Sequence, residues 1–136
     1  MNILKPQNFH FQELEDKHLM DISEDEKINY CKFENEECND INLYEIEFKQ
    51  CKFSKICMQK GKLEKLTFRD VVFEQCDFSN TEFIENSFIR CEFNNCKVSG
   101  GNFAESRLYN VTFIETNASY INLSMDSIEN ILFKNT

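Results

Sequence analysis

The chain has 136 residues, enough for one domain, and its 41% hydrophobic and 29% charged residues are typical of soluble globular proteins rather than disordered ones. Asp and Glu outnumber Lys and Arg by 24 to 15, and the net charge of −9 argues against nucleic acid or an anionic membrane as the partner, because both require a basic surface. No apolar run reaches the length of a membrane span and residues 1–16 lack the apolar core of a secretory signal, so we expect a cytoplasmic protein with reduced cysteines.

Residues 1–26 precede any regular repeat and are acidic from Asp16 to Glu26. We expect this segment to cap the domain that follows in residues 27–136, because the end of a stacked-repeat fold needs a polar cover. A partner-binding tail is the alternative. The apolar underside of the cap would come from Phe9, Phe11, Leu14, Leu19 and Ile22.

From Ile28 onward, every fifth residue is apolar. The series has 22 members up to Phe133, and 12 of the 14 phenylalanines fall in it. An α-helix would spread these positions around its axis, since five residues turn it by about 500°. A strand would place them alternately on opposite faces. A chain that turns a corner once per five residues sends all of them inward, so the period predicts a solenoid.

Two further columns follow the same period. Two residues before each of these central positions, mostly small or apolar residues recur, as a second inward position requires. Glu36, Asn86 and Asp126 depart from this, and we expect local strain or a solvent-reaching side chain there. Two residues after the centre, Asn, Asp and Gly recur; these types accept the left-handed backbone that corners require.

Several units match the pattern Ala-Asp/Asn-Leu/Phe-x-x: Ile41-Asn42-Leu43, Cys76-Asp77-Phe78-Ser79-Asn80, Gly101-Asn102-Phe103-Ala104-Glu105 and Ile121-Asn122-Leu123. On these residues the chain resembles the pentapeptide repeat proteins over about residues 26–135. The resemblance implies an all-β fold, a right-handed quadrilateral β-helix of about five coils. Residues twenty apart then share a face, which places six residues in one core-stacking column: Phe33, Phe53, Phe73, Phe93, Phe113 and Phe133.

The stretch from Val72 to Thr136 is most similar to the quinolone-resistance (Qnr-type) subgroup, particularly at Phe73-Glu74-Gln75-Cys76-Asp77-Phe78-Ser79-Asn80 and Asn102-Phe103-Ala104-Glu105-Ser106. This narrower resemblance implies a DNA mimic that binds type II topoisomerases (DNA gyrase and topoisomerase IV) and protects them from quinolones. Many Qnr-type proteins carry loops that break the register, whereas this chain has none between Ile28 and Phe133. The alternative is a structural or scaffolding protein–protein interaction module unrelated to topoisomerases.

With twenty residues per coil, the face centred on Leu43, Leu63, Phe83, Phe103 and Leu123 is the most acidic. It carries Glu45, Glu64, Glu82, Glu85 and Glu105 against Lys62 and Lys65, and we expect the five glutamates to form the partner-binding surface. Residues 31–135 hold 17 acids and 12 bases, a net charge of −5. Per unit length, this net charge is about a third of that of duplex DNA. This density permits DNA mimicry, and an ordinary solvated surface is the alternative.

Two cysteine pairs are twenty apart, Cys31 with Cys51 and Cys76 with Cys96, so each would stack on adjacent coils within reach of a disulfide. We expect buried thiols that act as small apolar fillers. Cys57 falls at an outward position and would be the reactive thiol.

Catalytic patterns are absent from the sequence. The two histidines, His10 and His18, lie near the N-terminus, and no phosphate-binding loop, metal-spaced Cys/His set or nucleophile elbow occurs. A hydrolase using Cys57 would need a base that nothing places beside it. We therefore expect no enzymatic activity, cofactor or metal.

The last five-residue unit contains Ile131 and Phe133 and has no predicted cover. Exposed strand edges and apolar ends favour association. We expect a twofold homodimer through this end.

Overall fold

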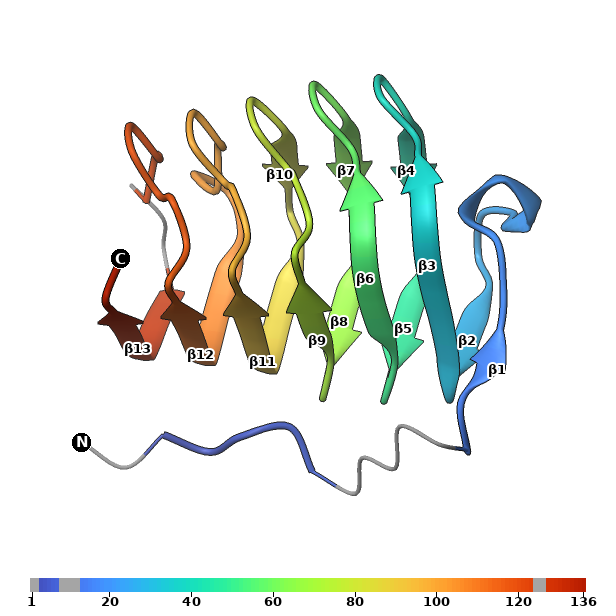
Figure 1. Cartoon of the computed structure of the whole chain (residues 1–136), viewed down its shortest axis with the longest axis horizontal. Coiled ribbons are helices and arrows are strands. Elements are labelled where there is room, and N and C mark those ends of the chain that lie inside the picture. The colour runs from blue at the N-terminus through green and yellow to red at the C-terminus, as the bar shows by residue number, and fades with distance from the viewer. Residues whose placement is uncertain (1–2, 8–12, 124–126) are drawn as a thin grey trace.

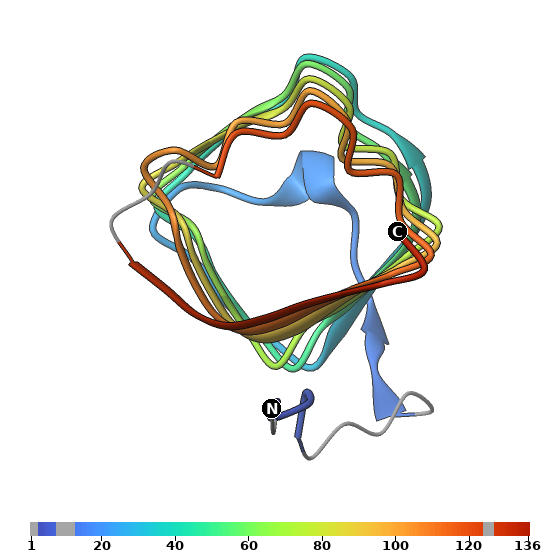
Figure 2. The same ribbon diagram turned by 90° about the vertical axis from the view of Figure 1, so that its left-hand side faces the viewer.

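In the computed structural model, residues 3–7, 13–123 and 127–136 are described. They form an all-β solenoid of about six turns whose strand pairs are parallel (Figure 1). Viewed along its long axis, the solenoid has a four-sided outline (Figure 2). The predicted all-β solenoid is confirmed; the number of turns exceeds the predicted five because the column from Phe33 to Phe133 has a member on each of six successive coils.

Two adjacent sides share one sheet. The side that carries the phenylalanine column, the Phe face, consists of β3 (Cys31–Glu37), β6 (Lys52–Cys57), β9 (Val72–Glu74) and parts of β11 (Ser87–Asn94), β12 (Arg107–Ile114) and β13 (Ser127–Lys134). The neighbouring side consists of β2 (Lys27–Asn29), β5 (Glu47–Lys49), β8 (Thr67–Arg69) and the remaining parts of β11 to β13. Paired residues are twenty apart throughout this sheet's coils, as Phe53 and Phe73 illustrate.

The other two sides are less regular. The side opposite the Phe face carries a three-stranded sheet of β4 (Asn42–Tyr44), β7 (Lys62–Glu64) and β10 (Glu82–Ile84). The fourth side is held by single bridges, such as those that Asp77 makes with Cys57 and with Lys97. Every side therefore repeats at the same twenty-residue spacing.

The corners require a left-handed backbone at the residue two positions after each centre. At every described corner position from Asp25 to Asn135 except Glu105, φ lies between 47° and 69°. The tertiary structure imposes this conformation on residues that rarely adopt it, including Lys65 and Arg90. Hydrogen bonds to the next coil hold them, as where the Lys65 N–H donates to the Ile84 carbonyl at 2.9 Å.

Stacked aromatic rings fill the interior. Neighbouring rings of the Phe column lie 4.5 to 5.1 Å apart between centroids, close to the spacing of adjacent strands. A second column of Phe48, Phe68 and Phe88 stacks beside it and meets it edge to face. Parallel stacking within columns and edge contacts between them are both favourable arrangements for aromatic pairs.

The second inward positions carry hydrogen-bond donors as well as apolar groups. Cys76 Sγ donates to the Phe53 carbonyl at 3.3 Å, and Ser106 Oγ donates to the Phe83 carbonyl at 2.7 Å. Thr116 does the same toward Phe93. Each donor reaches the central residue 23 positions earlier, so Cys, Ser and Thr interchange in this column because each can donate. All seven cysteines are free thiols.

Two of the three polar residues predicted to strain the core are instead hydrogen-bonded there. Glu36 accepts the Leu19 N–H at 3.1 Å, and its side chain is only 12% exposed. Asn86 is buried and its Oδ1 accepts the Leu66 N–H at 2.9 Å. The expectation of a solvent-reaching side chain was wrong for Asn86, because the Leu66 N–H lies within reach of its carbonyl oxygen. Among the described residues no group pairs with the buried Asn86 Nδ2, and the Glu36 carboxylate stays partly exposed. Asp126 lies outside the described residues.

At the N-terminal end, the short 3-10 helix η2 (Leu19–Asp21) lies across the opening of the first coil (Figure 2). Leu19 is buried in the core there, and β1 (Glu15–Asp16) pairs with β3. Phe9, His10 and Phe11 lie outside the described residues. The assignment of residues 1–26 as a capping segment stays a prediction.

At the opposite end, β13 has no neighbour on one side within the described residues. Ile128, Leu132 and Phe133 are 47%, 41% and 41% exposed, although Phe113 one coil earlier is fully buried. Association through this end stays a prediction, which light scattering of the unmodified chain and of a Phe133→Glu variant tests.

Candidate partner-binding face

The acidic face is the side formed by β4, β7 and β10. Glu64 lies on β7 between Tyr44 and Ile84 of the adjacent strands. Glu82 lies on β10 beside Lys62, and on the next coil beside Asn102. Glu82 is exposed and Glu64 is half-buried. These two carboxylates therefore face solvent from regular strands, but each has uncharged or basic neighbours.

The other three predicted glutamates lie along one edge of this face, the acidic corner, formed by Asp25, Glu45, Lys65, Glu85 and Glu105. Successive residues of the row lie one coil apart, about 4.8 Å. Glu85 and Glu105 are exposed and lie twenty residues apart, on coils that are bridged on this face by Glu82 and Asn102. Asp25 extends the row by a coil, since its N–H donates to the Glu45 carbonyl. Sequence reasoning missed Asp25, although it lies twenty residues before Glu45 and so continues the same register.

A lysine interrupts the acidic corner. Lys65 Nζ lies 3.4 Å from the Tyr44 hydroxyl and 5.6 Å from the centre of that ring. The hydrogen bond to Tyr44, followed by the charges of Glu85 and Glu45, raises the pKa of Lys65. Lys65 therefore places an exposed cation between Glu45 and Glu85 in the row, and the uninterrupted acidic stretch is limited to Glu85 and Glu105.

Charge also varies along the solenoid. Residues 47–66 contain six lysines and two glutamates, whereas residues 67–86 contain one arginine and five acids. Lys52 and Glu74 form an ion pair across these two coils at 3.0 Å. The surface thus has a basic band around one coil and an acidic band around the next, in contrast to the uniform charge of duplex DNA.

A shallow hollow of about 220 Å³ lies where the coil that carries Glu82 meets the coil that carries Glu105. Its lining includes Glu82, Ile84, Asn102 and Glu105. A partly apolar lining that includes two glutamates suits a Lys or Arg side chain, which has an aliphatic stem and a charged head.

The remaining candidate groups show no catalytic arrangement in the part of the chain that the structure describes. Cys57 is half-buried and its Sγ donates to Asn39 Oδ1 at 3.1 Å. His18 pairs instead with Glu36, at 3.7 Å. No group of three His, Cys, Asp or Glu side chains among the described residues could hold a metal ion. Nor do they include a helix long and apolar enough to cross a membrane.

Comparisons with known proteins give one family match. The family model described as the pentapeptide repeat region matches residues 66–136. No curated protein matches the chain in sequence. Two solved structures of trypsin-treated variants of QnrB1, a plasmid-mediated fluoroquinolone resistance protein, are similar to it. The first is 14% identical in sequence and has a TM-score of 0.49, and the match covers 79% of this chain and 67% of the QnrB1 chain. The second is 12% identical and has a TM-score of 0.36, and the match covers 97% of this chain and 88% of the QnrB1 chain.

Proposed function

This chain belongs to the pentapeptide repeat family, and on that premise we propose that it is a non-enzymatic binding protein whose acidic face mimics DNA in the groove of a type II topoisomerase, DNA gyrase or topoisomerase IV. Protection of that enzyme from quinolones would follow. The observation that carries the proposal is the group of exposed carboxylates Glu82, Glu85 and Glu105 on two successive coils, with Glu82 and Glu105 lining one hollow.

The spacing of these carboxylates supports the proposal. Residues of the acidic corner recur about every 4.8 Å along the solenoid axis, and one strand of B-DNA carries a phosphate about every 3.4 Å of helix axis. Long Lys and Arg side chains of a DNA-binding groove can follow either spacing. The hollow between Glu82 and Glu105 would hold one such side chain.

The basic band restricts where the contact lies. Lys62 and Lys65 occupy the same face one coil before Glu82 and Glu85, and they would repel a basic groove. The contact is therefore centred on residues 82–105 rather than on the whole face. Glu45 lies one coil before the lysines and Glu64 lies on the same coil as they do, so both contribute mainly at long range.

A charge-reversal variant tests the proposal. Replacing Glu82, Glu85 and Glu105 with Lys should weaken gyrase binding, mainly by slowing association, and should abolish protection in a supercoiling assay with a quinolone. The matched control replaces Glu34, Glu74 and Glu115 on the Phe face, which changes the net charge equally. If both triple variants lose binding alike, net charge and not this face is responsible, and the proposal is wrong.

The lysine that interrupts the row gives a test of opposite sign. Lys65→Gln removes a positive charge between Glu45 and Glu85, so gyrase binding at low salt should become tighter. The gain should disappear as salt is added. Unchanged or weaker binding would contradict a contact at the acidic corner.

A scaffolding role is the second candidate, and the alternating acidic and basic bands favour it. A partner with complementary bands would match such a surface better than a uniformly basic groove does. Absence of gyrase binding by the unmodified protein at low salt would favour scaffolding over DNA mimicry.

A further inference from the structure

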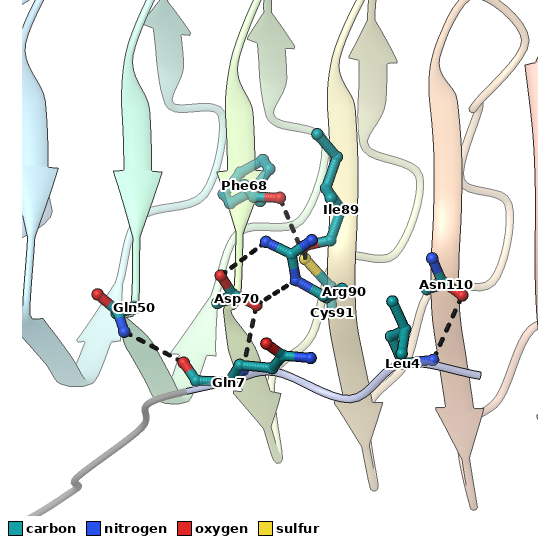
Figure 3. Close-up of polar contacts among 9 residues, drawn as sticks. All are labelled: Leu4, Gln7, Gln50, Phe68, Asp70, Ile89, Arg90, Cys91 and Asn110. Carbon is teal, nitrogen blue, oxygen red and sulfur yellow. Dashed lines mark hydrogen bonds and ion pairs between the residues drawn. The ribbon is translucent and has the colours of Figure 1, made fainter. Parts of the chain in front are cut away.

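Residues 3–7 lie against one corner of the solenoid, far in sequence from the residues they contact (Figure 3). This corner, between the β2 side and the Phe face, is called here the Asp70 corner and consists of Tyr30, Gln50, Asp70, Arg90, Asn110 and Asn130. The segment runs along the long axis of the solenoid, across the strands rather than beside one of them (Figure 1).

The corner side chains hold the main chain of this segment. Asp70 Oδ1 accepts the Gln7 N–H at 3.1 Å, and Gln50 Nε2 donates to the Gln7 carbonyl at 3.1 Å. Asn110 Oδ1 accepts the Leu4 N–H at 3.3 Å. Side chains of the corner therefore bind the N–H and the carbonyl of Gln7 and the N–H of Leu4.

The spacing of the corner selects an extended peptide. Asp70 and Asn110 lie two coils apart, about 9.6 Å, and three residues of chain cover this distance at about 3.2 Å each. That rise is the rise of a β-strand. Pro6 fits within the bound stretch, because its restricted φ suits an extended backbone and no N–H is required from it.

Neighbouring side chains orient the groups that bind the segment. Arg90 forms a bidentate pair with Asp70, with Nε 2.7 Å from Oδ1 and Nη2 3.0 Å from Oδ2. Asn130 Nδ2 donates to Asn110 Oδ1 at 3.2 Å, which identifies that atom as the acceptor. Gln50 and Asp70 are 4% and 5% exposed. The corner on the other edge of the Phe face is exposed at Asn35, Lys55, Gln75, Asn95 and Glu115.

A groove beside the segment adds side-chain contacts. It measures about 270 Å³ and is lined by Ile3 and Lys5 of the segment and by Glu92, Ile114 and Leu132 among other residues of the Phe face. Leu4, between the two, is 49% exposed. Lys5 is exposed as well, and the groove, which Glu92 helps to line, suits an apolar and a basic side chain two residues apart.

We propose that the Asp70 corner is a peptide-binding site that recognises the main chain of an extended segment, and that the chain's own residues 3–7 are its resident ligand. The site is distinct from the acidic corner, so the two proposals can fail separately. A resident segment has an effective concentration in the millimolar range, so it excludes weaker peptides from the site.

A competition experiment in the full chain tests this proposal. Leu4→Pro together with Gln7→Pro removes both donor N–H groups from the resident segment. A fluorescent peptide of residues 1–10 with the native sequence should then bind the double variant at least tenfold more tightly than it binds the unmodified chain. Adding Asp70→Ala and Asn110→Ala should remove that binding, whereas adding Gln75→Ala should not. Equal binding to the double variant and the unmodified chain would overturn the proposal.

Amide hydrogen exchange tests the same site in the unmodified chain, without any variant that could misfold. Leu4 and Gln7 should exchange at least tenfold more slowly than Lys5, whose N–H donates no hydrogen bond within the described residues. Equal exchange at the three amides would overturn the proposal. Protection that grows with protein concentration would also overturn it, since the ligand would then be the segment of a second copy.

Discussion

Replacing Phe73 with Ala tests the energetics of the stacked core. Phe73 is 1% exposed and lies between Phe53 and Phe93, with ring centroids 5.1 Å and 4.5 Å away. Phe68 and Phe78 meet it edge to face at 5.3 Å and 5.4 Å. Removing the ring leaves a cavity that these neighbours cannot fill, because the strand pairing on both sides fixes the coil spacing.

The expected loss in the free energy of unfolding is about 3–5 kcal/mol, and the lost aromatic pairs favour the upper part of this range. With a urea m-value of about 2 kcal/mol/M, the midpoint should fall by about 2 M when unfolding is followed by circular dichroism.

Two matched variants determine whether burial in the stack causes the loss. Phe133→Ala removes a ring of the same column that is 41% exposed and, among the described residues, stacks only on Phe113, so it should cost only about 1 kcal/mol. Glu74→Ala removes an outward side chain paired with Lys52 and should cost about 0.5 kcal/mol or less. Equal midpoint shifts for Phe73→Ala and either control would refute the assignment of an enclosed column.

Three further predictions concern polar side chains in and near the core. Ser106→Ala should lower stability by about 1–3 kcal/mol in thermal melts, because it removes the hydroxyl that donates to the Phe83 carbonyl. Ser106→Cys should cost less, because a thiol can also donate. Equal losses for the two variants would contradict this. Burial raises the pKa of Asp77, but hydrogen bonds from Ser79 and Gln59 outweigh it and the net pKa is lowered. The stability from this group is therefore present above the unfolded pKa of about 3.9 and is lost as the pH falls through the lower folded pKa. In a plot of the urea midpoint against pH, Asp77→Asn should flatten the decline at acid pH. An unaltered decline would contradict this. Burial raises the pKa of Cys51 to about 12, so a thiol reagent at neutral pH should modify the half-buried Cys57 before Cys51. Mass spectrometry of the labelled protein measures this order. Several thiols that react at the same rate would contradict it.

The five-residue period determined much of this protein by itself. One large apolar residue in every five specifies a chain that turns corners and buries one side chain per side, and Phe73 illustrates the result. Because the coils repeat at a constant spacing, the register of twenty also places Glu82 beside Asn102 and Lys62 beside Glu82. Such contacts are predictable, since each one recurs at a constant separation in the sequence.

Only the tertiary structure decided the contacts that occur once. Leu4 reaches Asn110 across 106 residues, and Glu36 turns its carboxylate to the Leu19 N–H. Neither contact recurs at the five- or twenty-residue spacing, so no recurring pattern in the sequence predicts it. The left-handed backbone at Arg90 has the same origin. Its local preference opposes that conformation, and the hydrogen bonds and stacking of the neighbouring coils outweigh the preference because they hold the corner on both sides.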